Sequence, residues 1–302
     1  MAGTRVFAKL ACVNNPNYGI PDAFRSDRPP EIINSGIYSP NNPPWYVPAG
    51  LSVWIASVLL IIAIPNLFLL PYILSQGIAT GDSAAMMEFL QSDATAVLLS
   101  IIAIIPAHVL TLVLAWVVVT RLRSFSFREM LGWQWGNFSW WHYVLILAAF
   151  FVLAAVVGHF FPEQENSLLK ILRSSRAAVF GVAFLATFSA PIVEEVVYRG
   201  VLYSPLQRAV GVPLAVLIVT SLFALVHVPQ YWPSFSTISL LTLLSLILTI
   251  VRVYSKNLLP CIVLHFIFNG IQSAALVLEP YLSNGVSDLQ QPAAILGSIV
   301  VK

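Results

Sequence analysis

Residues 177–203 read AAVFGVAFLATFSAPIVEEVVYRGVLY. This run is long enough to cross a bilayer as a helix, for which about 20 apolar residues suffice. Its second half nevertheless contains three charged residues, Glu194, Glu195 and Arg199. Ionisable side chains inside a membrane span are costly to bury and usually mark a functional site. This segment therefore predicts a membrane protein and also indicates where its chemistry lies.

The whole chain shares this apolar character. Of its 302 residues, 58% are hydrophobic and 9% are charged, whereas soluble domains are roughly one quarter charged. This composition excludes the pair of soluble domains that the length alone would allow. The formal net charge of +2 argues against a nucleic-acid partner, because phosphate binding needs a clustered basic surface. Two cysteines, Cys12 and Cys261, are too few for a disulfide framework.

Seven apolar runs have the length of transmembrane helices. They cover residues 51–73, 96–120, 143–161, 177–203, 213–228, 238–254 and 258–278. Because backbone polar groups must be satisfied inside a bilayer, helices are the expected structure. We therefore predict an all-α, polytopic transmembrane helical bundle of about seven to eight helices. The final run, 293–301, is too short to span a bilayer alone, which leaves a half-helix or an interfacial tail.

The chain divides into four parts. Residues 1–44 form a polar, proline-rich tail, and residues 45–165 hold the first membrane helices with an interfacial segment. Residues 170–280 hold the remaining helices, and residues 281–302 form a C-terminal tail. Most of the 15 Lys and Arg residues lie in the N-terminal tail and in the connections after the second, fourth and sixth spans. The excess of basic residues predicts an integral, multi-pass membrane protein with a cytoplasmic N-terminus.

Helix geometry assigns different roles to the charges of the fourth span. Glu195 and Arg199 are four residues apart, so they lie one turn apart on one face and can neutralise each other. We predict that they form a structural ion pair. Glu194 is rotated by about 100° from Glu195. It has no cation on its own face and can point towards the neighbouring helices.

Further polar residues lie on other spans. His227 lies near the end of the fifth span, and His265 and Asn269 share one face of the seventh. Together with Glu194 they form the predicted catalytic set, in which a carboxylate, two imidazoles and an amide converge from three helices. His108, on the second span, is expected to be a structural histidine that hydrogen-bonds to a carbonyl group.

This set of groups suits the hydrolysis of an amide bond by water. A carboxylate beside an imidazole can take a proton from water, and an imidazole with an amide N–H can stabilise the resulting oxyanion. Cys261 lies four residues before His265, but a lone cysteine there is more often a packing residue. Two other interpretations stay open: the polar groups hold the helices together, or they relay protons in a transporter.

Three motifs carry a resemblance to a known family, and they read Glu194-Glu195-x-x-x-Arg199, Phe223-x-x-x-His227 and His265-x-x-x-Asn269. In this order they resemble the CPBP (Abi-type) family of intramembrane proteases, which are related to the CAAX prenyl endopeptidase and to bacteriocin-processing proteins. The resemblance extends over about residues 175–275. The resemblance implies that residues 170–280 form a CPBP-like catalytic core.

The resemblance implies a role for each residue. Glu194 would activate water together with His227, while His265 and Asn269 would form the oxyanion site. The family has also been described as metal-dependent, and Glu194, His227 and His265 would supply the three protein ligands of a catalytic zinc. The chain has no His-Glu-x-x-His helix. We expect a glutamate mechanism without a cofactor, with zinc as the alternative.

The expected function is that of an intramembrane endopeptidase. It would hydrolyse a peptide bond of a membrane-associated protein or peptide, including a lipidated, CAAX-type one. The alternative is a non-proteolytic immunity or scaffold protein built on the same helical core. The expected partners are this substrate and the lipid bilayer, and no nucleic acid.

Overall fold

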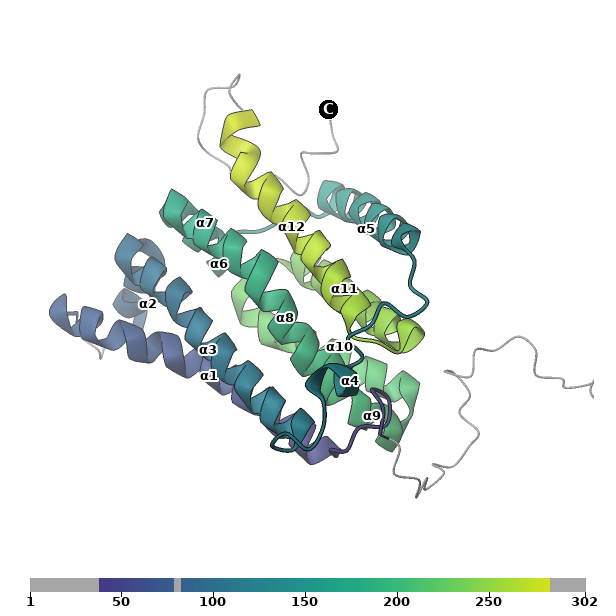
Figure 1. The fold of residues 1–302 in the computed structure, drawn as a ribbon. Helices are drawn as coiled ribbons and strands as arrows, with labels where there is room; N and C mark the ends of the chain where they lie inside the picture. Colours follow the sequence, from purple (N-terminus) through teal and green to yellow (C-terminus); the bar gives the residue numbers. More distant parts are fainter. Residues whose placement is uncertain (1–37, 79–82, 283–302) are drawn as a thin grey trace, which may run out of the picture.

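The computed structural model describes residues 38–78 and 83–282, which form a bundle of helices (Figure 1). No strand occurs among these residues, and Ser39 and Asn42 form only an isolated bridge. The elements are α1 (Val47–Ser75), α2 (Ser83–Ser92), α3 (Ala94–Thr120), α4 (Phe127–Leu131), α5 (Trp140–Phe160), α6 (Ser167–Ser174), α7 (Arg176–Phe184), η2 (Leu185–Ser189), α8 (Ala190–Glu195), η3 (Val196–Leu202), α9 (Tyr203–Val210), α10 (Val212–Tyr231), α11 (Phe235–Ser255) and α12 (Leu259–Leu282). Both η elements are π-helical turns.

Seven helical segments of the described chain are long and apolar enough to cross a membrane. They are α1, α3, α5, the composite run Arg176–Val210, α10, α11 and most of α12. The predicted all-α polytopic bundle is confirmed, and the predicted runs agree within a few residues except at the end of the fourth. The final apolar run 293–301 and most of both tails lie outside the described residues, so the cytoplasmic N-terminus stays a prediction.

The composite run Arg176–Val210 lies at the centre of the bundle. Its α7 and α8 parts lie between α3 and α12 (Figure 1), and its η3 and α9 parts pack against α1. The approach of α1 is close at Gly50, where an added Cβ would lie 2.9 Å from Val201 O. Lipid tails are as apolar as these side chains, so close packing and polar contacts hold membrane helices together.

A proline changes the backbone hydrogen bonding at η2. Here the Ala190 N–H donates to Leu185 O, five residues back. In the same register the donor for Ala186 O would be Pro191, which has no N–H. The side chain of Asn269 on α12 donates to this carbonyl instead, with Nδ2 2.7 Å from Ala186 O.

A second proline has the same effect at η3. In the α-helical register Val201 O would accept from residue 205, which is proline and cannot donate. Nε1 of Trp45, just before α1, donates to Val201 O at 2.9 Å. Such π-helical turns are frequent at functional sites. The two turns flank α8, which contains Glu194 and Glu195.

Two arginines hold residues 38–45 against the helix ends. Arg252 of α11 is fully buried and donates to Pro40 O and Asn41 Oδ1, both at 2.8 Å. Arg208 of α9 donates to Pro43 O at 2.9 Å. By sequence, Arg208 and Arg252 belong to the basic residues at the connections after the fourth and sixth spans, but their side chains bond to backbone and amide acceptors of residues 40–43.

Candidate active site

Glu195 and Arg199 form an ion pair in the centre of the bundle. Arg199 Nη1 lies 3.0 Å from Glu195 Oε1, and both side chains are 0% exposed. Arg199 also donates from Nε to Thr249 Oγ1 at 3.3 Å and from Nη2 to Ser245 O and Oγ at 2.9 and 2.8 Å. A buried guanidinium needs such acceptors because its burial is otherwise costly. Here α11 supplies them.

His265 of α12 lies between the two adjacent carboxylates. Its Nδ1 is 2.8 Å from Glu195 Oε1, and its Nε2 is 3.9 Å from Glu194 Oε2. Because a carboxylate only accepts, the hydrogen is on Nδ1 and Glu195 orients the ring. The distance to Glu194 is longer than a hydrogen bond. Glu195 therefore has a second role, as the residue that orients His265, which helix geometry alone did not reveal.

The two neighbouring glutamates differ in their access to other molecules. The side chain of Glu194 is 23% exposed, whereas that of Glu195 is completely buried. Glu195 Oε1 is shared by Arg199 and His265, while Glu195 Oε2 is buried with no hydrogen-bond partner among the described residues. A water molecule or a substrate can therefore reach only Glu194.

His227 is held by its own helix, α10. Its Nδ1 is 2.7 Å from Phe223 O and donates to it, which leaves Nε2 for another partner. The ring of Phe223 packs against His227 with centroids 4.7 Å apart and lies 6.4 Å from the ring of His265. Phe223 thus links the two imidazoles.

Asn269 lies one turn beyond His265 on α12. One of its amide hydrogens is used in the bond to Ala186 O at 2.7 Å, so the other remains for a different acceptor. Neither Asn269 nor His227 hydrogen-bonds to Glu194 in the described part of the chain. The structure thus places Glu194 beside His265. His227 is connected to His265 through the ring of Phe223, and Asn269 lies one helical turn from His265.

His108 of α3 also lies at this site. It is buried, its Nδ1 is 2.6 Å from Ser189 Oγ, and it lies within electrostatic range of Glu194. Its partner is a hydroxyl group just before α8 and not the carbonyl expected from the sequence. The sequence shows His108 as an ionisable residue within a span, but nothing in the sequence indicates that it contacts the residue before α8.

The residues proposed for zinc are not arranged as a metal site. Across residues 38–78 and 83–282, no three His, Cys, Asp or Glu side chains are grouped so that they could hold a metal ion. His265 Nδ1 is bonded to Glu195, and His227 Nδ1 to Phe223 O. Each imidazole keeps Nε2 free, as metal-binding histidines do, so it is the spacing of Glu194, His227 and His265, and not these bonds, that does not form a metal site in the described residues.

Cys261, which lies four residues before His265, is a packing residue in this structure. It is fully buried, and its Sγ donates to Leu248 O at 3.4 Å. A buried thiol in apolar surroundings is inert, since the thiolate is the nucleophile.

Residues 175–271 match the family model described as Type II CAAX prenyl endopeptidase Rce1-like. All three motifs quoted above lie within this segment. The match confirms the resemblance to the CPBP family and supports a CAAX-type, membrane-embedded protease in general. No curated protein and no solved structure matches the chain.

Proposed function

We propose that this CAAX-type core is an intramembrane endopeptidase in which Glu194 activates the water that cleaves the substrate. The observation that carries the proposal is the contrast between two adjacent carboxylates. Glu195 is buried and bonded to Arg199 and His265, whereas Glu194 is accessible and faces His265 at 3.9 Å. An accessible carboxylate with no Lys or Arg partner among the described residues suits a general base.

The proposed reaction begins with transfer of a proton from water to Glu194. The water oxygen attacks the carbonyl carbon of the scissile amide, and the π electrons of that bond move to the oxygen. The C–N bond of the tetrahedral intermediate then breaks, and Glu194 returns its proton to the leaving nitrogen. The products are a carboxylic acid and an amine. His227 would orient the attacking water through Nε2, the ring nitrogen that is not bonded to Phe223 O.

His265 and Asn269 are proposed to stabilise the oxyanion. Asn269 has one amide hydrogen beyond the one that it donates to Ala186 O. For His265 this role needs a hydrogen on Nε2 as well as on Nδ1. The ring is then positively charged, and the carboxylate of Glu195 stabilises that charge. One donor of this kind accounts for about a hundredfold to a thousandfold in rate in other hydrolases.

The test is cleavage of an internally quenched, membrane-anchored peptide by the purified protein in proteoliposomes. We expect Glu194→Gln to lower the cleavage rate by at least about a hundredfold, the range typical of a general base. Glu129→Gln, the same change at an exposed residue of α4, should leave the rate unaltered. Cleavage by the Glu194→Gln variant at the wild-type rate would overturn the proposal.

The same assay separates the remaining alternatives. Peptides with and without a prenyl group test whether the substrate is lipidated. We propose a reaction without a metal, so activity should persist after treatment with EDTA, and loss that is restored by zinc would contradict this. A non-proteolytic immunity or scaffold role requires that the Glu194→Gln variant rescue a deletion phenotype as well as the wild type does.

A further inference from the structure

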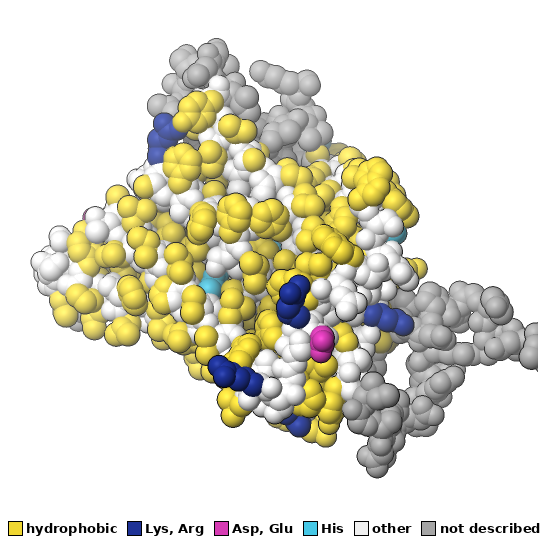
Figure 2. Space-filling view, in the orientation of Figure 1, with side chains coloured by type: hydrophobic (Ala, Val, Ile, Leu, Met, Phe, Trp, Pro, Cys, Tyr) yellow, Lys and Arg dark blue, Asp and Glu magenta, His cyan; other side chains and the backbone are white. Residues whose placement is uncertain are grey.

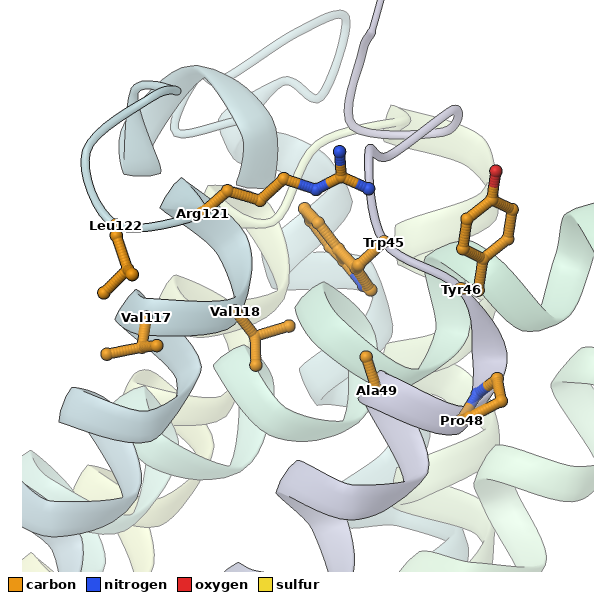
Figure 3. Close-up of a pocket in the computed structure, with 8 residues that line it drawn as sticks. All are labelled: Trp45, Tyr46, Pro48, Ala49, Val117, Val118, Arg121 and Leu122. Atoms are coloured by element: carbon orange, nitrogen blue, oxygen red, sulfur yellow. The ribbon is translucent and has the colours of Figure 1, made fainter.

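An apolar groove lies between the start of α1 and the end of α3 (Figure 3). Its volume is about 550 Å³, which is within the range of small-molecule sites. Ala49 of α1 and Val117 and Val118 of α3 form apolar parts of its wall. None of the four proposed catalytic residues lines it. The groove is therefore separate from the candidate active site.

The rim of the groove is basic and aromatic. Arg121 directly follows α3, and its side chain lies across one end of the groove above the indole of Trp45 (Figure 3). Its Nη2 donates to Pro44 O, but arginine has five N–H donors, so others remain for a second acceptor. Tyr46, also on the rim, is 68% exposed. Trp and Tyr gather where membrane helices meet the lipid headgroups.

The surroundings of the groove are also basic. Arg208 lies over the ring of Tyr46 at 5.1 Å, and Arg123 lies over the ring of Trp116 at 6.0 Å. Figure 2 shows basic side chains around a single acidic one in the lower part of this face, beside α4 and above the adjoining ends of α1 and α3. A ligand with a negative head and an apolar chain is complementary to these walls and this rim.

We propose that the groove binds one molecule of an anionic phospholipid. Its acyl chain lies between α1 and α3 against Val117 and Val118, and its phosphate accepts hydrogen bonds from Arg121. Guanidinium groups match the geometry of phosphate oxygens. Basic pockets between membrane helices are known to bind anionic headgroups. A zwitterionic lipid has the same acyl chains and a phosphate, but its headgroup has no net negative charge, so the basic rim attracts it less strongly.

The test is native mass spectrometry of the full-length protein, purified in mild detergent and incubated with dioleoyl phosphatidylglycerol or dioleoyl phosphatidylcholine. We expect the wild type to retain more of the anionic lipid. Arg121→Gln should lower that retention about fivefold, the effect of one basic residue at an anionic membrane surface. Lys170→Gln, the matched loss of one exposed charge outside the groove, should leave it unchanged.

A second variant tests the groove itself. Ala49→Phe fills it with a ring and should lower retention of the anionic lipid while Arg121 stays in place. The proposal is overturned if both lipids bind equally to the wild type, or if Arg121→Gln and Lys170→Gln act alike. It is also overturned if Ala49→Phe retains the lipid fully, or if a peptide or a second copy of the chain is retained in its place.

Discussion

Glu194 and Glu195 allow the same substitution at adjacent positions, with opposite expected results. Glu195→Gln should lower the free energy of unfolding by about 3 kcal/mol, whereas Glu194→Gln should change it by less than about 1 kcal/mol. Glu194→Gln should nevertheless abolish cleavage. The prediction therefore separates a structural from a catalytic carboxylate within one turn of one helix.

The magnitude follows from the contacts of each side chain. Removing one partner of a buried ion pair costs about 3–5 kcal/mol, because the other charge is left uncompensated. Arg199 keeps its bonds to Thr249 and Ser245, so the lower end applies. Glu194 is partly exposed, and its ion-pair contact is a distant one, 3.9 Å from His265.

The assay is unfolding in mixed micelles at increasing denaturant, followed by tryptophan fluorescence, together with the cleavage assay on the folded protein. A double variant, Glu195→Gln with Arg199→Met, supplies the control. Because it removes both charges of the buried pair, it should be more stable than Glu195→Gln alone. Equal destabilisation by the two single substitutions, or a double variant less stable than Glu195→Gln, would refute the reasoning.

Three further predictions concern the surroundings of the site. Asn269→Ala should lower the free energy of unfolding by about 1–3 kcal/mol, since Ala186 O would lose its donor; an unchanged denaturation midpoint would contradict this. Trp45→Phe should cost a similar amount, about 1–3 kcal/mol, because Val201 O would lose the hydrogen bond from Trp45 Nε1; an unchanged denaturation midpoint would contradict this as well. Burial raises the pKa of Glu163, between α5 and α6, above its ordinary value of 4.5. The folded state then binds this proton more tightly, so wild-type stability should fall as the pH rises above 4.5 through the raised pKa. Glu163→Gln should reduce this decline, measured as the unfolding midpoint at a series of pH values across that range. Identical pH profiles for the wild type and the variant would contradict the prediction.

The membrane helices could be predicted from the sequence because their length and apolar character are local properties. The one clear error, the end of the fourth span, has a local cause as well. Hydropathy falls after residue 203, where α9 begins, but the helix continues to Val210. Leu206 on α9 is buried, while Arg208 satisfies carbonyl groups of the preceding tail. A short amphipathic helix of this kind is not recognised by apolar length alone.

Spacing along one helix also predicted which site residues share a face. The positions of Glu195 and Arg199 differ by four, and this periodicity holds wherever the helix packs. By contrast, the bond from His265 to Glu195 and the bond from Asn269 to Ala186 O each join two helices. They depend on how far each helix is rotated and shifted against its neighbour.

The sequence by itself thus determined the membrane class, the seven spans and the residues that can do chemistry, because each depends on hydropathy or on the helical period. Only the tertiary structure decided that Glu195 orients His265 and that Glu194 is the accessible one of the two adjacent glutamates. It also decided that Arg252 points inward to hold the segment before α1. The physical reason is that a contact between helices is set by the packing of the whole bundle, which no single segment of sequence contains.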